Sequence, residues 1–312
     1  MANELTLGTA ASPGSARDMR AAEIFNSLIH ENLVDRTDLR QTMVRLGDLG
    51  GSGSDTLTTP KVSFDDPMAA ANTDEVTAAG NTALGVGQTS IAVAHQILAY
   101  GLSDKFMITG GPGNLNMAQL AAKMADAYIL RVTDLVCTAA ESFSADVTAS
   151  TNMDVAAFFD SIAQLEQSSV PGPYSCVLHH NQWVELQSSL RGETSNTIAF
   201  NPATPEQIAI KGPGYQGTLY GCDTYSVDSV TSGGGHYNGF MMGLGALAYV
   251  EASPRQAMPG SMAALVTPAG SPLYAEFDRD ADPGISRIVG HAFCGVSILE
   301  DARGVGILSD TP

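Results

Sequence analysis

Residues 47–90 read GDLGGSGSDTLTTPKVSFDDPMAAANTDEVTAAGNTALGVGQTS, and this stretch decides how the rest of the chain is interpreted. It has almost no helical pattern, and a structureless loop of this length is uncommon inside a compact domain. Thr56–Thr59 and Val62–Phe64 are rich in β-prone residues, and Ser90–Tyr100 predicts a strand directly afterwards. An extended hairpin therefore fits the pattern better than a disordered linker. Since such an arm has nothing of its own to pack on, it indicates an assembly.

The composition is that of an acidic protein that can form a core. The chain has 312 residues, and a length of this order corresponds to about two domains. Its formal net charge of −18 opposes nucleic-acid binding by phosphate neutralisation, although an acidic wall could still enclose a packed polymer. The N-terminal sequence predicts no signal peptide, and the longest apolar run, Phe240–Val250, is too short to cross a bilayer. We therefore expect a soluble protein made in the cytosol, with no membrane partner.

The rest of the chain alternates between helical and strand-like patterns. Helices are predicted at Ala16–Leu33, at 117–142, in a segment that Asn152 caps and Pro171 ends, and at Asn181–Arg191, with a short turn at Thr37–Val44. Strands are predicted at Tyr174–His179, Ile208–Ile210, Gly217–Val230, Tyr237–Val250, Leu273–Asp278, Gly284–Cys294 and Gly304–Leu308. The helix over 117–142 would be roughly 40 Å long. This order of arm, hairpin, long helix, α/β block and closing strands is uncommon for an enzyme.

One glycine-rich motif resembles a dinucleotide-binding fingerprint. Gly243, Gly245 and Ala248 have the spacing G-x-G-x-x-A, but the fingerprint needs a strand before it and a helix after it. Here the motif lies in an apolar strand pattern, so close packing of small residues explains it better. Neither a phosphate-binding G-x-x-x-x-G-K-[ST] loop nor a G-x-S-x-G elbow occurs. We expect no cofactor and no catalytic site.

The best metal candidate is the alternating carboxylate run of Asp278, Asp280 and Asp282, which resembles the start of a calcium loop. Pro283 stands where such a loop needs Gly, and Val289 stands where it needs Glu. A hairpin turn rich in Asp, Pro and Gly therefore explains the run better.

Histidines and cysteines give no stronger metal signal. His179 and His180 are adjacent, so on a strand they would point to opposite faces. His95 and His291 lie in strand patterns and are expected in a core or an interface. The four cysteines are widely spaced and are expected to be buried free thiols, and Trp183 to be a core anchor.

Five stretches, taken in order, carry a resemblance to a known family. They are HQILAYGLSDKF (95–106), MAQLAAKMADAYILRVTDLV (117–136), YSCVLHHNQWVELQSSLRG (174–192), GTLYGCDTYSVDSV (217–230) and NGFMMGLGALAYV (238–250). The first resembles the strand that returns from an extended loop, and the second resembles a spine helix. The third resembles the strand and helix of an axial domain. The chain from about residue 16 thus resembles the major capsid proteins of tailed bacteriophages, which have the Hong Kong 97-type fold.

The resemblance implies an α+β capsid fold with five parts. These are an N-terminal arm with a helix (1–46), an extended β-hairpin loop (47–100), a peripheral domain with the spine helix (101–150), an axial domain (151–265), and C-terminal strands that return to the peripheral domain (266–312). It also implies a structural, non-catalytic subunit that forms pentamers and hexamers. These would tile an icosahedral virion shell, assembled in the host cytoplasm, around the double-stranded DNA of a tailed phage. A separate scaffold protein, a portal and a decoration protein are the partners that it implies.

The resemblance also implies where subunits touch. Lys61, Phe64, Asp65 and Asp66 in the extended loop, and the Gly233, Gly234 and Gly235 turn, are the contact candidates. Lys61 is the only lysine in the loop, so it is the local candidate for a covalent cross-link, although a solvated surface lysine explains it better. Two other functions stay open. One is the shell of a cellular nanocompartment of the encapsulin type, and the other is a soluble α/β ligand-binding protein or enzyme.

Overall fold

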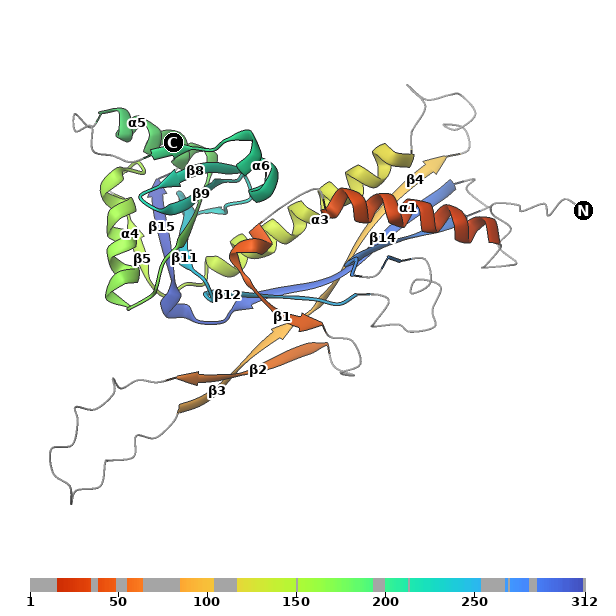
Figure 1. Ribbon diagram of the computed structural model, residues 1–312, viewed down its shortest axis with the longest axis horizontal. Coiled ribbons are helices and arrows are strands. Elements are labelled where there is room, and N and C mark those ends of the chain that lie inside the picture. Colours follow the sequence, from red (N-terminus) through yellow and green to blue (C-terminus); the bar gives the residue numbers. More distant parts are fainter. Residues whose placement is uncertain are drawn as a thin grey trace, which may run out of the picture.

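The structure is a computed structural model that describes residues 16–34, 39–48, 55–63, 85–103, 117–149, 151–192, 200–212, 214–253, 267–268, 270–280 and 285–310. These residues form an elongated body and a rounder lobe, from which a long hairpin projects (Figure 1). Helices and antiparallel-rich sheets occur together, so the predicted α+β class is confirmed.

The helices are α1 (Ala16–Val34), α3 (Met117–Ala140), α4 (Val155–Gln167), α5 (His180–Gly192) and α6 (Pro205–Lys211), with 3₁₀ turns η1 (Leu39–Thr42) and η2 (Asp301–Arg303). The strands are β1 (Val44–Asp48), β2 (Thr56–Ser63), β3 (Gly85–Ala92), β4 (Ala94–Ser103), β5 (Asp146–Thr148), β6 (Tyr174–Leu178), β7 (Phe200–Pro202), β8 (Tyr215–Leu219), β9 (Cys222–Ser226), β10 (Ser232–Gly233), β11 (His236–Gly243), β12 (Leu247–Glu251), β13 (Leu273–Asp280), β14 (Ile285–Ile298) and β15 (Gly304–Asp310). None of the helices described here is long and apolar enough to span a membrane.

The elongated body is built from a five-stranded sheet and two helices. The strands run in the order β1-β12-β14-β13, and β4 pairs with β14 as well. The long helix α3 has 24 residues, a length of about 36 Å, and packs on β14 through a buried stripe that includes Met124, Tyr128 and Val132. Helix α1 lies against α3 and β13, and buries Phe25 and Ile29. The helical periodicity of the sequence therefore predicts both helices correctly, because each buries one apolar stripe.

A buried polar side chain fixes α1 to the sheet. The Asn26 amide donates to the Ala275 carbonyl at 3.2 Å and accepts from the Ala275 backbone N–H at 2.7 Å. Asn26 is fully buried, so both of its polar atoms need partners. The Asn26 side chain thus bonds to the Ala275 backbone of β13 as a neighbouring strand would.

The rounder lobe holds an eight-stranded sheet in the order β5-β15-β11-β6-β9-β8-β7, with β10 beside β11. Helices α4 and α5 pack with it around a second core. Trp183 is 5% exposed in this core, which confirms its predicted role as an anchor. The lobe is not continuous in sequence. β12 follows β11 along the chain but belongs to the sheet of the body, and β15, near the C-terminal end, belongs to the sheet of the lobe. The segment 266–312 therefore contributes β13 and β14 to the body and β15 to the lobe.

Four local predictions are wrong. The predicted strand Gly217–Val230 is two strands, β8 and β9, which pair antiparallel across a turn at Tyr220 and Gly221. Ile208–Ile210 lies in α6, whose start is a capping box: the Thr204 hydroxyl accepts from the Gln207 N–H, and the Gln207 side chain accepts from the Thr204 N–H. The predicted strand Tyr237–Val250 is two strands, β11 and β12, which belong to different sheets. Between them Gly245 has a φ of +93°, a conformation that glycine adopts without a steric penalty.

The fourth correction concerns the start of α4. Its N-cap is Asp154 and not Asn152, because the Asp154 carboxylate accepts from the Ala157 N–H at 2.8 Å. Asn152 is exposed, two residues before the cap.

Candidate assembly surfaces

The hairpin of β2 and β3 projects from the body (Figure 1). β2 and β3 pair antiparallel from Thr56 opposite Ala92 to Ser63 opposite Gly85, and they form a two-stranded sheet of their own. The predicted hairpin is thus confirmed. A two-stranded ribbon is marginally stable in water by itself, and no other strand of the described residues extends this sheet. Its described part therefore presents a surface that another molecule could cover.

Only the base of the hairpin is built into the core. Ile91 is fully buried and packs with Ala248 and Val250 of β12, and Leu57 and Val93 join the same cluster. The Val93 N–H donates to the Asp55 carbonyl at 2.8 Å and closes the base. The projection is consequently anchored at its base, and none of the packing described for the rest of the chain reaches beyond that base.

A single glycine allows the strand to pass from the hairpin into the sheet. A Cβ on Gly295 of β14 would lie 2.2 Å from the Ala92 carbonyl oxygen and 3.3 Å from Ile91. The chain therefore crosses β14 at a glycine, because any larger residue at position 295 would collide with the Ala92 carbonyl. After the crossing it continues as β4, which pairs with β14 from Ala94 to Ser103.

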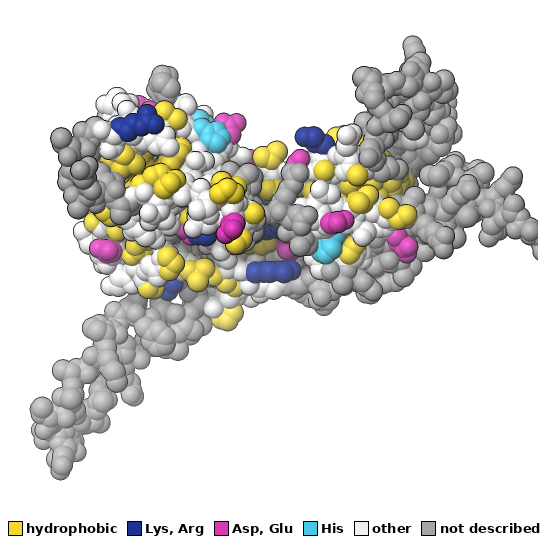
Figure 2. All heavy atoms as spheres, turned by 45° about the horizontal axis from the view of Figure 1, so that its top comes forward, with side chains coloured by type: hydrophobic (Ala, Val, Ile, Leu, Met, Phe, Trp, Pro, Cys, Tyr) yellow, Lys and Arg dark blue, Asp and Glu magenta, His cyan; other side chains and the backbone are white. Residues whose placement is uncertain are grey.

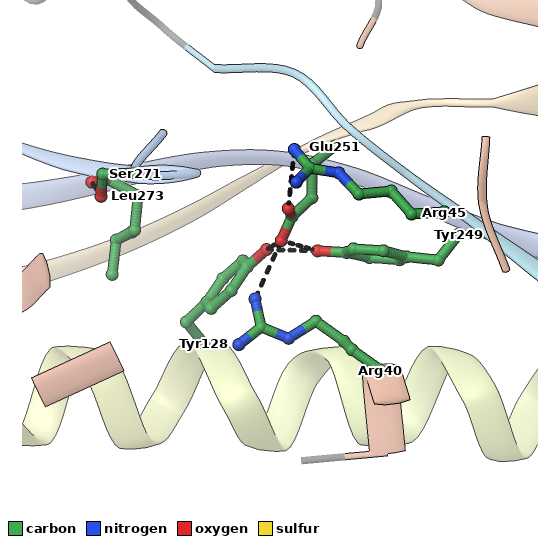
Figure 3. A network of polar contacts seen from close by, with 7 residues as sticks. All are labelled: Arg40, Arg45, Tyr128, Tyr249, Glu251, Ser271 and Leu273. Atoms are coloured by element: carbon green, nitrogen blue, oxygen red, sulfur yellow. Dashed lines mark hydrogen bonds and ion pairs between the residues drawn. The ribbon is translucent and has the colours of Figure 1, made fainter. Parts of the chain in front are cut away.

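A buried ionic network fixes the segment that leads into the hairpin (Figure 3). Glu251 of β12 is 5% exposed, and its Oε1 accepts from Arg40 at 2.9 Å and from the Tyr128 hydroxyl at 2.8 Å. The Tyr249 hydroxyl donates to the same oxygen and lies 2.6 Å from the Tyr128 hydroxyl. Arg45 of β1 is 3.5 Å from Glu251 Oε2.

The electrostatics of the network keep both tyrosines protonated. Burial raises the pKa of Tyr128 well above its usual value, and the neighbouring Tyr249 and Glu251 raise it further. Burial likewise raises the pKa of Tyr249, as does the Glu251 carboxylate. Both hydroxyls therefore remain donors to the carboxylate, whose charge Arg40 and Arg45 balance. Because these groups come from η1, β1, α3 and β12, the network joins the entry to the hairpin with the long helix. No sequence pattern pointed to it.

The predicted contact residues fall into two groups. Lys61 lies on β2 opposite Gly87, in the projecting hairpin. Phe64, Asp65 and Asp66 lie outside the described residues. Gly234 and Gly235 have φ angles of +65° and +87°, and Gly233 pairs with His236, so the three glycines form the tip of a tight hairpin between β10 and β11. Their role as subunit contacts stays a prediction.

Large hydrophobic side chains are exposed on both parts of the molecule. They are Ile24, Ile97, Leu130, Phe159, Val184, Ile208, Ile210, Tyr220 and Leu244. On the face shown in Figure 2, hydrophobic side chains gather on the body and on the lobe, and charged ones are few. Helix α6 buries none of its residues, and it is fixed by the Lys211 ammonium, 2.6 Å from Asp223. Single exposed hydrophobic side chains are normal on protein surfaces, so these residues by themselves identify no interface.

The metal candidates do not converge. Asp278 is exposed on β13, and Asp280 opposite Ile285 is the last described pair before the β13–β14 turn. Asp282 lies outside the described residues. Within the described ranges no group of three or more potential ligands could hold a metal ion. The antiparallel pairing of β13 and β14 confirms the hairpin that was predicted for this carboxylate-rich segment.

Four of the histidines make ring contacts or hydrogen bonds in the structure. His179 stacks on Tyr237 at 4.0 Å between ring centroids, while His180 Nδ1 lies 2.5 Å from the Ser226 hydroxyl. They mark the end of β6 and the start of α5, as the sequence predicts. His95 and His291 lie on paired strands, with 3.0 Å between their ring nitrogens. All four cysteines are buried and free, as expected.

The glycine motif is not a dinucleotide site. Gly243 ends β11 and Ala248 lies in β12, so a strand follows the turn where the fingerprint requires a helix.

No protein-family model and no curated protein matches this sequence. Solved structures do match the fold. A chain from Mycobacterium phage Che8 is 15% identical with a TM-score of 0.60, over 87% of this chain and 91% of that one. The capsid of Ralstonia phage GP4 is 10% identical with a TM-score of 0.61, over 89% and 90%. The encapsulin complex of Synechococcus elongatus is 10% identical with a TM-score of 0.57, over 86% and 85%. The chain, with its projecting hairpin, long helix and two sheets, therefore has the Hong Kong 97-type capsid fold.

Proposed function

We propose that this chain is a shell-forming structural subunit, the major capsid protein of a tailed phage. The observation that carries the proposal is the hairpin, which is anchored at Ile91 and Gly295 and which, within the described part of the chain, has no supporting layer beyond that base. A neighbouring copy would supply the missing surface. The fold supports the same conclusion, since the solved structures that share it include phage capsids and an encapsulin.

The proposed assembly has several parts. Copies form pentamers and hexamers in an icosahedral shell, with the lobe as axial domain and the body as peripheral domain. The shell encloses double-stranded DNA in a virion that is assembled in the host cytoplasm. The net charge of −18 supports enclosure without binding, because acidic walls do not hold phosphates. A scaffold protein, a portal and a decoration protein complete the proposed set of partners.

A second candidate is the shell of an encapsulin-type nanocompartment. The match to an encapsulin complex, with nearly the same coverage and TM-score as the phage matches, favours it. The content of the particle distinguishes the two. A phage capsid isolated from its natural source holds DNA, whereas a nanocompartment holds a cargo protein.

The first experiment is expression of the full chain, followed by size-exclusion chromatography and negative-stain microscopy. Closed particles in the void volume are expected, with a scaffold protein co-expressed if the chain alone gives only capsomers. A monomer under both conditions would contradict the proposal and favour the ligand-binding alternative.

A hairpin variant tests the observation itself. Residues Pro60–Gln88 are replaced by Asn-Gly, which closes Thr59 and Thr89 with a two-residue turn. Leu57 and Ile91 stay in place, so the base of the hairpin keeps its packing. We expect a folded subunit that no longer assembles. Normal particles from this variant would contradict the role of the hairpin.

A further inference from the structure

The ladder partners of β14 define an open edge of the five-stranded sheet. Ile288 pairs with Phe277 of β13 on one side and with Tyr100 of β4 on the other. Cys294 pairs in the same way with Glu251 of β12 and with Ala94 of β4. β13 and β12 therefore follow each other along one side of β14, and β4 alone occupies the other. Among the residues that the structure describes, none forms a ladder with the outer edge of β4.

The strand itself has neither the charges nor the prolines that protect edge strands in monomers, and no described strand pairs with its outer edge. β4 has ten residues, AHQILAYGLS, without Lys, Arg, Asp, Glu or Pro. Natural proteins block long edges with charges, prolines, bulges or a covering element, because free N–H and C=O groups pair with other chains. Ile97 in the middle of this strand is 61% exposed. The edge thus has the composition of a pairing surface in a chain whose net charge of −18 otherwise disfavours contact between copies.

We propose that β4 pairs, along this outer edge, with β4 of a second copy of this chain. The two strands run antiparallel about a twofold axis and join two five-stranded sheets into one. A twofold contact uses the same patch on both copies, and an antiparallel strand pair satisfies that condition. The inference goes beyond the proposed function, since a shell held by its hairpins alone needs no contact at β4.

The alternation of side chains along β4 selects the register. Leu98 and Tyr100 pack on the core that lies under α3, while His95, Ile97 and Ala99 are on the other face and exposed. Directly opposed residues of an antiparallel pair lie on the same face of the sheet. A twofold axis perpendicular to the sheet must therefore lie midway between two copies of the same residue. With the axis at Ile97, the Ile97 side chains of the two copies lie opposite each other, and each His95 lies opposite the Ala99 of the other copy. This register buries the exposed apolar side chain of each copy against its equivalent.

A cysteine substitution tests the register directly. Directly opposed residues have Cα atoms about 4.5–5.5 Å apart, a separation that a disulfide spans. Ile97→Cys supplies the only exposed thiol among the described residues, because the four native cysteines are buried. Ala163→Cys on α4 is the matched control, since Ala163 is also exposed and lies in the lobe and not in the body. Under mild oxidation of assembled particles, we expect more than half of the Ile97→Cys chains to run as dimers on non-reducing gels, and the control to run as monomers.

A charge substitution gives an independent readout. Ile97→Lys places two like charges opposite each other at the axis and should reduce particle or dimer yield at least tenfold, while Ala163→Lys, at an exposed position of α4 in the lobe, leaves it unchanged. Circular dichroism of the Ile97→Lys subunit shows whether it remains folded. Assembly of Ile97→Lys at the normal yield would overturn the proposal, as would Ile97→Cys particles that stay monomeric on oxidation. In the second case a neighbour's hairpin or another protein occupies the edge. Failure of the wild-type chain to form particles would instead contradict the proposed function, and the disulfide dimer in solution would still decide the inference.

Discussion

The crossing of β14 by the hairpin strand makes Gly295→Ala the most informative single substitution. The added Cβ would lie 2.2 Å from the Ala92 carbonyl oxygen, a backbone atom that cannot rotate away. The Ala92 carbonyl would have to move by roughly 1 Å, and overpacking of this kind costs typically about 1–3 kcal/mol. Replacement of glycine by alanine also removes freedom from the unfolded chain, which offsets about 0.4–1 kcal/mol. We expect a net loss of about 1–2 kcal/mol.

Two other glycines serve as controls for the Gly295→Ala variant. A Cβ on Gly290 would lie 2.4 Å from the terminal methyl of Met124, a flexible atom that can move, so a smaller loss is expected. A Cβ on Gly101 would only touch Ile285 at 3.4 Å, an ordinary contact. The expected order of stability is therefore Gly101→Ala, then Gly290→Ala, then Gly295→Ala.

The assay combines urea denaturation, limited proteolysis and assembly yield. If the crossing strand is displaced, protease cleavage should increase within 55–92 before the rest of the chain is cut, and particles should be lost. A Gly295→Ala protein with the same urea midpoint and particle yield as Gly101→Ala would refute the reasoning. It would mean that the crossing is not a tight contact and that the hairpin needs no anchor there.

Three further substitutions test the network, the histidine pair and the helix cap. Tyr128→Phe removes a hydroxyl 2.8 Å from the buried Glu251 carboxylate and should destabilise the subunit by about 1.5–3 kcal/mol in urea, whereas Tyr237→Phe, whose hydroxyl bonds to exposed Asn181, should stay close to wild type. Burial lowers the pKa of His291, Glu276 opposes this shift, and His95 adds to it. The unfolded chain therefore binds a proton at this histidine more readily than the folded chain does. The free energy of unfolding should consequently fall as the pH drops below about 6.5. His291→Gln should flatten this fall in melting temperature between pH 7.5 and 5, and an unchanged slope would contradict the assignment. Asp154→Ala should cost about 1 kcal/mol of stability and Asn152→Ala should cost nothing measurable; the reverse order in thermal melts would restore Asn152 as the cap of α4.

The sequence predicted those elements whose pattern is complete within a short window. Met124, Tyr128 and Val132 recur at helical spacing and are buried together on α3. The β-prone pieces on both sides of the polar loop likewise predicted β2 and β3, because hairpin pairing needs only neighbouring strands.

The errors arose where a short apolar run had two possible interpretations. Ile208–Ile210 is too short to distinguish a strand from a helix by periodicity. The capping signal at Thr204, Pro205 and Gln207 was present in the sequence and would have identified α6. In Tyr237–Val250 the apolar residues are continuous, and only Gly245, at a positive φ, marks the turn that sends β11 and β12 to different sheets.

Short stretches of sequence were enough to predict the helices and the strands of the hairpin, because each of these patterns depends on residues a few positions apart, and the composition was enough to show the acidic character of the chain. The tertiary structure alone decided that Glu251 meets Arg40 and Tyr128, residues 211 and 123 positions away. It also decided that the strand after the hairpin passes Gly295 and becomes an open edge. Contacts of this kind depend on which strands pair and in which register, and no local pattern encodes the pairing of segments so far apart.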